Sequence, residues 1–336
     1  MDPTRFFCTR WYAWQNPDWS QKHENPYQHY LDVGRFEGRD PSALIDVQKY
    51  LQVTGGKIAP QNVYQHILNG FRAPAVGVYE ELDDLVEIQR RFTKEIRLTI
   101  HKQSIARAPR PYLVVLQAGP GSIHKEWYDA ENRNWDLLVN YYDTRGFEQG
   151  FGDYVFLQPG TKFTAMNKLL QISPETLLKY SYILFLDDDI RVTCGDLNRL
   201  FETVAHLGFD LAQMSLSDTS HCMWPALYRA SSPDGFREVS AVEIMMPVMS
   251  NRALKHIGPS LGESVSGFGL DLLWGKTVKG IGGKIAVLDS VTAHHEQPID
   301  TRGGAYYSFM RENMINPKAE LWRLILKYDL EWDIIT

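Results

Sequence analysis

Short apolar runs separated by polar segments dominate the chain from residue 112 onward. Seven of these runs have the length of a β-strand, and they lie at 112–118, 135–143, 154–159, 182–189, 210–217, 241–250 and 284–290. Between them, residues 162–180 and 195–208 place apolar side chains at helical spacing. Alternation of strands and helices predicts an α/β fold with a mostly parallel sheet and helices on both faces. A continuous apolar strand such as YILFL, at 182–186, is typical of a sheet covered on both sides.

A helical periodicity precedes this region. Residues 79–106 carry apolar side chains at helical intervals, namely Leu82, Leu85, Val86, Ile88, Phe92, Ile96 and Ile100. Acidic residues crowd the beginning of the stretch and basic residues its end, as the helix dipole favours. We therefore predict one long connecting helix, which ends before Pro109 and Pro111 because proline cannot continue a helix.

The first 75 residues are rich in aromatic and turn residues, and they contain a short internal sequence repeat. YQHYL begins at Tyr27 and YQHIL begins at Tyr64, and each is followed by a glycine, at Gly34 and Gly70. This spacing suits a repeated helix–turn–helix unit, although similarity over five residues can also arise by chance. We expect four parts: a small helical repeat appendage at 1–75, a connecting helix and linker at 76–110, an α/β catalytic domain at 111–315 and a C-terminal helix at 316–336.

Composition narrows the class of protein. The 336 residues carry a net charge of −6, so there is no basic excess to follow a phosphate backbone, and nucleic-acid binding is disfavoured. The three cysteines are too far apart in sequence for a zinc cage or a disulfide framework, which indicates a reducing compartment. No stretch approaches the roughly 18 apolar residues that span a bilayer. We expect a cytoplasmic protein that contacts the inner membrane peripherally or not at all.

Three consecutive carboxylates, Asp187, Asp188 and Asp189, begin where the apolar strand YILFL ends. In open α/β sheets ligands bind beyond the carboxyl ends of the strands. Adjacent carboxylates repel one another, and a divalent cation offsets that repulsion; all-oxygen ligands suit Mg²⁺ or Mn²⁺. A solvated acidic turn is the alternative. Other candidates at strand ends or before helices are Asp143, Asp271, His294 and His295.

Two resemblances to known families extend this picture. Residues 16–51, with NPDW, NPYQHYLDVGRFEGRDP and IDVQKYL, resemble helical modules found beside the catalytic domains of bacterial polysaccharide glycosyltransferases. Residues 112–306 resemble the glycosyltransferase-like family catalogued as domain of unknown function 707. The matching stretches include LLVNYYD, GTKFTAMNKLL, YSYILFLDDDI, SGFGLDLLWG, VLDSVTAHHEQP and RGGAYY. This resemblance implies a GT-A-like fold, a nucleotide-binding sheet that uses a nucleotide-sugar donor.

The resemblance also implies roles for individual residues. Asp187 and Asp189 match the acidic motif that holds a metal, Mn²⁺ or Mg²⁺, and the donor ribose, and His295 matches a late histidine that completes the metal shell. Relatives usually have glutamate where this chain has Asp188, which leaves the role of that residue open. Asp271 matches the base of inverting enzymes. The residues expected near the nucleoside are Asp143, Lys162, Asn167 and Lys168.

The expected function is a metal-dependent glycosyltransferase that moves a sugar from a nucleotide-sugar to a saccharide acceptor in bacterial surface polysaccharide synthesis, inverting with Asp271 as base. Two alternatives stay open. One is a catalytically silent carbohydrate-binding or scaffolding subunit of a polysaccharide-synthesis complex. The other is a nucleotidyltransferase, which requires a glycine-rich phosphate loop; residues 117–127 are a weak candidate for it. Minor candidates are Glu243, His221, Trp224, Arg302, Gly303 and Gly304.

Overall fold

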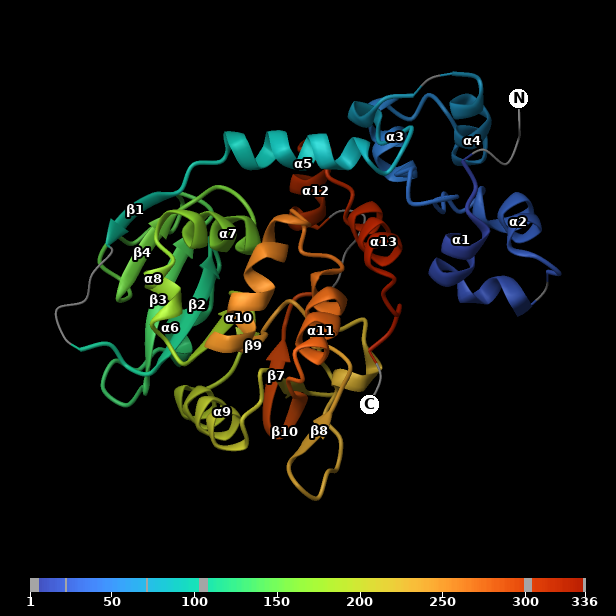
Figure 1. Ribbon diagram of the computed structural model, residues 1–336. Coiled ribbons are helices and arrows are strands. Elements are labelled where there is room, and N and C mark those ends of the chain that lie inside the picture. The colour runs from blue at the N-terminus through green and yellow to red at the C-terminus, as the bar shows by residue number, and fades with distance from the viewer. Residues whose placement is uncertain (1–5, 22, 71, 103–107, 299–303, 335–336) are drawn as a thin grey trace. The chain divides into compact units, whose positions relative to one another are not determined.

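The computed structural model describes all residues except 1–5, 22, 71, 103–107, 299–303 and 335–336. The chain forms two compact units (Figure 1). The helical unit comprises Met1–Phe92 and Asp300–Arg323, and the sheet unit comprises Thr93–Ile299 and Leu324–Thr336. The minor candidates Arg302 and Gly303 lie outside the described residues.

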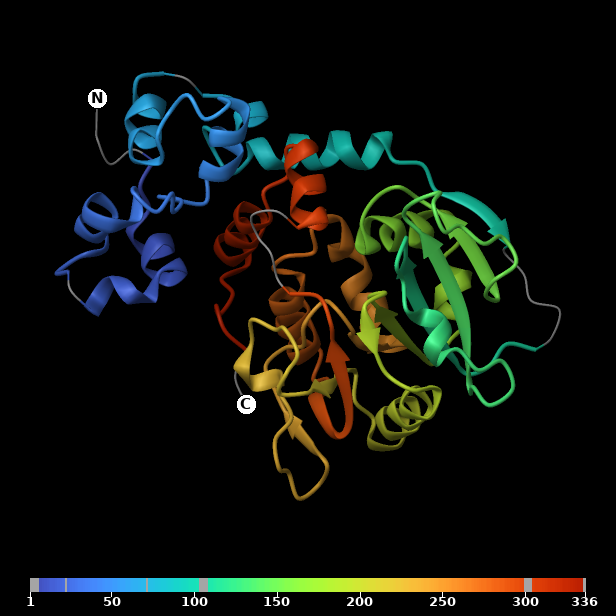
Figure 2. The same cartoon turned by 180° about the vertical axis from the view of Figure 1, so that it is seen from behind.

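Ten strands of the described residues form the sheet, in the order β1-β4-β3-β2-β5-β9-β7-β10-β6, with β8 paired to β10. Strands β4, β3, β2 and β5 are parallel neighbours, and β7 is parallel to β10. Figure 1 shows β4, β3 and β2 side by side, and Figure 2 shows them from behind, with β1 at the outer edge. The strands are β1 (Thr99–Lys102), β2 (Tyr112–Ala118), β3 (Trp135–Tyr141), β4 (Tyr154–Leu157), β5 (Tyr182–Leu186), β6 (Ile190–Arg191), β7 (Leu211–Leu216), β8 (Phe236–Glu238), β9 (Val248–Ser250) and β10 (Ile285–His295).

The central strands are covered on both faces. Every residue of β3 and β7 is buried, as are all residues of β2 and β5 after the first. This confirms the mixed α/β fold with a mostly parallel sheet, because such strands need helices on both sides. The helical segments of the sheet unit are α6 (His124–Trp127), α7 (Lys162–Ile172), α8 (Glu175–Leu178), α9 (Cys194–Leu207), η4 (Pro225–Leu227), α10 (Asn251–Ile257), η5 (Gly258–Gly262) and α11 (Leu270–Gly280).

Two strands differ from the prediction in ways that matter for the site. The expected strand at 241–250 is reduced to β9, which runs antiparallel between β5 and β7, and the residues before it form a loop. The expected strand at 284–290 continues to His295 as β10. A register shift between Leu288 and Thr292 interrupts its pairing with β7, and the strand then pairs with β6. A bulge of this kind re-aims the residues that follow it.

The helical unit contains the predicted repeat. Tyr12 and Tyr50 occupy matching places in α1 (Thr9–Gln15) and α3 (Val47–Val53), and each phenol hydrogen-bonds a histidine of the following helix, at His29 and His66. Chance similarity does not produce matched tertiary contacts. The other helical segments are η1 (Pro17–Gln21), α2 (Pro26–His29), η2 (Tyr30–Gly34), α4 (Pro60–Leu68), η3 (Pro74–Val76), α5 (Asp84–Glu95), α12 (Ala305–Glu312) and α13 (Pro317–Tyr328); α5 and α13 cross the boundary between the units.

The long connecting helix predicted at 79–106 is wrong. Helix α5 ends at Glu95, and Thr99–Lys102 form β1, which pairs antiparallel with β4. The β-branched side chains of Thr99 and Ile100 suit a strand, and the free edge of β4 supplies the hydrogen-bonding partner that helical periodicity could not reveal. Residues 304–323 belong to the same compact unit as the N-terminal helices, so the helical unit does not end at residue 75.

Candidate functional site

The carboxyl ends of two neighbouring strands define the site. Strands β2 and β5 are neighbours in the sheet. From β2 the sheet continues through β3 and β4, and from β5 it continues in the opposite direction through β9. A ligand crevice in an open α/β sheet lies at such a switch point. Asp187, Asp188 and Asp189 follow the last residue of β5, and Gly119 follows the last residue of β2. The backbone N–H of Gly119 donates to Asp188 Oδ2 at 3.0 Å, which joins the two strand ends.

Asp187 is held by a buried lysine. Lys162, the first residue of α7, is 7% exposed, and its Nζ donates to Asp187 Oδ1 at 2.8 Å and to the Ile244 carbonyl at 2.6 Å. Helix α7 begins at this residue because Thr161 and Thr164 form a reciprocal capping box. Burial raises the pKa of Asp187, and the nearby charge of Lys162 opposes that rise. The lysine therefore connects α7, the end of β5 and the loop before β9.

Asp188 is the least compensated of the three carboxylates. Besides the Gly119 N–H, only the phenol of Tyr142 approaches it among the described residues, at 3.4 Å. Burial and the charges of Asp187 and Asp189 together raise the pKa of Asp188 to about 7. At neutral pH the group is thus poised between its acid and its carboxylate.

Asp189 lies against His295, which β10 supplies. Pairing of β6 with the end of β10 sets Ile190 opposite His295 and brings the imidazole Nε2 to 3.1 Å from Asp189 Oδ2. The other ring nitrogen, Nδ1–H, donates to the His221 carbonyl at 2.6 Å. Burial lowers the pKa of His295, but the hydrogen bond and charge of Asp189 outweigh burial and raise it to about 9. A histidine anchored through Nδ1 to a carbonyl has the arrangement that metal-ligating histidines commonly adopt.

Two further carboxyl groups face the same region. Asp271 lies in the first turn of α11 and is 6% exposed; burial raises its pKa to about 6, while hydrogen bonds from Leu272 N–H and from the Trp224 side chain oppose the rise. Glu243 lies in the loop before β9, where its carboxylate accepts from the Met245 N–H at 2.7 Å. Burial and the charge of Asp271 raise the pKa of Glu243 to about 7.

Gly269 allows α11 to begin where it does. Its φ of 83° is in the left-handed region, which a residue with a side chain rarely adopts. Leu270 is the first helical residue, so the carboxylate of Asp271 lies in the first turn, near the positive end of the helix dipole. Trp274, fully buried one turn later, packs edge-on against Phe163 of α7 and fixes the helix against the sheet.

The remaining predicted residues lie at the margins of this cluster. Asp143 follows β3 and forms an ion pair with Arg145, whose guanidinium holds the pKa of Asp143 below its usual value. Asn167 and Lys162 are about 140° apart around α7, and Asn167 lies against Gly262 of η5. Lys168, half-exposed, follows it in the same helix. The structure thus brings Lys162, but not Asn167, into contact with the carboxylates at the end of β5.

The sequence did not predict three groups that contact the residues of the site. The Gly119 N–H and the His221 carbonyl are backbone groups, and no residue type announces a backbone donor or acceptor. Tyr142 lies near the end of the strand predicted at 135–143, in LLVNYYD, and directly follows the observed β3, so its place near a strand end was a usable signal. The candidate phosphate loop at 117–127 supplies Gly119, whose N–H is already engaged by Asp188, so this loop is not a free anion cradle.

The donor set is compatible with a divalent cation, although it is incomplete. Carboxylate oxygen from Asp189 is a suitable ligand, and so is the imidazole nitrogen of His295 once a cation displaces the proton between Nε2 and Asp189. Within the described residues, no three His, Cys, Asp or Glu side chains converge on one point as a ready metal site. Two protein ligands suffice for a cation that keeps water or substrate phosphate oxygens in its remaining positions. No helix in the part of the chain that the structure describes is long and apolar enough to cross a membrane.

Comparison with known proteins adds little to this geometry. No model of a known protein family matches the sequence, and no curated protein matches it. Among solved structures, the chain is similar to A197 from STIV, with 16% sequence identity over 55% of this chain and 85% of that chain, and a TM-score of 0.32. A similarity at this score identifies neither a shared fold nor a shared activity.

Proposed function

We propose that the sheet unit is a metal-dependent glycosyltransferase. It would take a sugar from a nucleotide-sugar donor and transfer it to a saccharide acceptor during bacterial surface polysaccharide synthesis. The observation that carries the proposal is the group of carboxylates with raised pKa values at the switch point of the sheet: Asp187, Asp188, Glu243 and Asp271. Perturbed carboxyl groups gathered in one crevice are typical of functional sites.

Asp189 and His295 would hold the cation, with Mn²⁺ or Mg²⁺ as the candidates. A bound divalent cation stabilises the negative charge that develops on a departing nucleoside diphosphate. The chain's own contribution is to fix the ligands. The His221 carbonyl orients the imidazole of His295, and Lys162 fixes the carboxylate of Asp187, which would lie beside the donor. On the family resemblance, Asp143, Asn167 and Lys168 would flank the nucleoside.

Asp271 would accept the proton of the acceptor hydroxyl. A general base is most effective when its pKa lies near the working pH, and burial has moved the pKa of Asp271 to about 6. The Leu272 N–H and the Trp224 side chain bond its carboxyl group and keep it in one orientation. One base and a single displacement at the anomeric carbon predict inversion of configuration.

The discriminating experiment is a thermal-shift screen of nucleoside diphosphates and nucleotide-sugars, with and without Mn²⁺. We expect a nucleotide to raise the melting temperature more in the presence of the metal, since a ligand of the native state stabilises it. Asp189→Ala should abolish the metal-dependent part. Asp234→Ala is the control, because Asp234 is exposed before β8, which pairs with the amino-terminal part of β10.

Three outcomes separate the candidate functions. Metal-dependent nucleotide binding followed by release of free sugar supports the transferase. Binding of saccharide without any nucleotide effect would identify the silent scaffolding subunit instead. Binding of nucleoside triphosphates with release of pyrophosphate would identify a nucleotidyltransferase. An unchanged metal response in Asp189→Ala would remove Asp189 from the site.

A further inference from the structure

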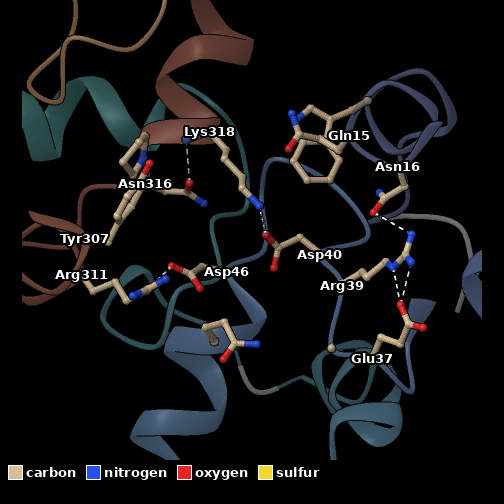
Figure 3. Close-up of a pocket in the computed structure, with 14 residues that line it drawn as sticks. Gln15, Asn16, Glu37, Arg39, Asp40, Asp46, Tyr307, Arg311, Asn316 and Lys318 are labelled. Atoms are coloured by element: carbon tan, nitrogen blue, oxygen red, sulfur yellow. Dashed lines mark hydrogen bonds and ion pairs between the residues drawn. The ribbon is translucent and has the colours of Figure 1, made fainter. Parts of the chain in front are cut away.

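A polar cavity lies wholly within the helical unit. Its volume is about 170 Å³, and Figure 3 shows its lining, which comes from α1, from the loop between η2 and α3, and from the C-terminal helices α12 and α13. Trp11 and Gln15 of α1 and Gln48 of α3 belong to the helices that precede YQHYL and YQHIL, and the proposed transferase chemistry gives these helices no role. Within the described residues no group of His, Cys, Asp or Glu could hold a metal ion, so we consider the cavity as a binding site.

The charges that line the cavity are equal in number and already paired. Three are acidic and three are basic, namely Glu37, Asp40, Asp46, Arg39, Arg311 and Lys318. Lys318 Nζ lies 3.2 Å from Asp40 Oδ2, and Arg311 Nε lies 3.3 Å from Asp46 Oδ2. Arg39 donates a hydrogen bond from Nε to Glu37 and one from each terminal nitrogen to Asp18. A charged ligand would have to break one of these pairs, whereas an uncharged ligand leaves them intact.

Several hydrogen-bonding groups at the cavity have no partner in the protein. Within the described residues, the side-chain amides of Gln15 and Gln48 make no hydrogen bond. The indole N–H of Trp11, a residue only 1% exposed, also lacks an acceptor there. The two amides each offer a donor and an acceptor to an occupant, and the Trp11 ring is part of the lining. Tyr307 adds a half-buried aromatic ring to the same lining.

These features fit an uncharged polyol. A ring of hydroxyls donates and accepts at once, which suits the two amides and also uses the outer lone pairs of the paired carboxylates. The C–H face of a sugar ring packs against an aromatic side chain such as Tyr307. A cavity of about 150 Å³ holds one six-membered ring, so the volume here corresponds to a single sugar unit.

We propose that this cavity is a binding site for one residue of a neutral saccharide chain, separate from the site on the sheet. The site requires no donor nucleotide and no metal. On the further assumption that the proposed transferase activity is correct, it would keep the acceptor polymer attached to the enzyme between transfers. Attachment at a second point raises the local concentration of the chain ends.

The test is saturation-transfer NMR and titration calorimetry on the full-length protein, without nucleotide or metal. The probes are methyl glycosides of neutral hexoses and their disaccharides, with glucuronate and inorganic phosphate for comparison. The double variant Gln15→Ala/Gln48→Ala removes the two free amides from helical positions that tolerate alanine. Gln52→Ala/Gln65→Ala is the matched control, with both changes at exposed helical positions of the same unit outside the cavity lining.

We expect at least one neutral glycoside to bind, a perturbed Trp11 indole N–H signal assigned through Trp11→Phe, and at least tenfold weaker binding in the cavity variant only. No binding by any neutral glycoside would overturn the proposal, as would wild-type affinity in the cavity variant or tighter binding of glucuronate or phosphate. Because the assay contains no nucleotide, failure of the proposed transferase leaves its result unaffected.

Discussion

Replacing Asp271 with asparagine tests both the electrostatics and the chemistry of the sheet unit. The side chain is 6% exposed, and burial raises the pKa of Asp271 from 3.8 to about 6. At pH 7 the folded protein thus holds a carboxylate where its environment favours the neutral acid. A rise of roughly two pKa units corresponds to about 3 kcal/mol of destabilisation once the group is ionised. Asparagine keeps the size of the side chain and one acceptor oxygen, and it removes the charge.

The effect on stability has a defined sign and pH window. Because the folded-state pKa lies above the unfolded one, the wild-type carboxyl group contributes stability below pH 4 that is lost as the pH rises to about 6. We therefore expect Asp271→Asn to be as stable as the wild type near pH 4. Above pH 6 it should be more stable, by at most about 3 kcal/mol, with each kcal/mol equivalent to roughly 2–4 °C in melting temperature.

The matched control is Asp289→Asn, also buried in the sheet unit. Burial raises the pKa of Asp289, but the Arg237 guanidinium, at 2.8 Å, outweighs burial and holds that pKa below its usual value. Here the sign is opposite: the substitution leaves Arg237 without its counter-charge and should destabilise the protein at pH 7. The difference should shrink as the pH falls and the wild-type carboxyl group is protonated.

The kinetic half of the prediction uses the same pKa. Asp271 can act as a base only when it is ionised. With a pKa of about 6, about 90% of the enzyme is in the active form at pH 7 and about 10% at pH 5. We expect kcat/KM for sugar transfer to fall about tenfold between these pH values and Asp271→Asn to lose roughly 10²–10⁴ in kcat, with nucleotide affinity within a few-fold. Lower stability of the variant at pH 7 would refute the electrostatic reasoning. Transfer at nearly the wild-type rate would refute the base.

Three further predictions concern the framework. Lys162→Met should cost about 2 kcal/mol in urea denaturation, less than for a fully buried pair because Asp187 still reaches solvent; an unchanged midpoint would contradict the role of this lysine. Tyr12→Phe should cost about 1–2 kcal/mol by leaving Nδ1 of the buried His29 without its hydrogen-bond partner, and equal stability would show that the repeat does not depend on this bond. Deletion of residues 1–75 removes ion pairs to the C-terminal helices, so size-exclusion chromatography should show aggregation, and a monodisperse product would refute that dependence.

Local sequence signals predicted the parts of the fold that depend on local chemistry. Dense apolar runs marked every parallel strand, and YILFL followed by three aspartates placed the site at a strand end. The antiparallel β9 was overestimated in length, because an apolar loop over a buried site has the same composition as a strand. Edge strand β1 was read as helix, because its pairing with β4 is a long-range contact that periodicity does not encode.

The acidic residues of the candidate site could be predicted from the sequence, but the groups that contact them could be predicted less well. Asp187, Asp189, Asp271 and His295 do gather at one end of the sheet. What brings His295 to Asp189 is a register shift in β10, which has no signature in the sequence. Long-range pairing and backbone hydrogen bonds are properties of the assembled sheet, and residue types report them only indirectly.

The buried carboxylates of the sheet unit fall into two groups, and the contrast bears on function. Away from the site each is matched by an arginine, in the pairs Asp136–Arg110, Asp153–Arg133, Asp210–Arg252 and Asp289–Arg237. At the carboxyl ends of β2 and β5, Lys162 pairs with Asp187 and His295 with Asp189, but among the described residues no arginine is paired with the remaining acids. Three of these acids, Asp188, Glu243 and Asp271, have a pKa of about 6 or 7. Stability alone would favour fewer acids there or another arginine. The protein neutralises its other buried carboxylates with arginines but keeps this destabilising group of acids in one place. Such a group is typical of a site that binds a cation or transfers protons.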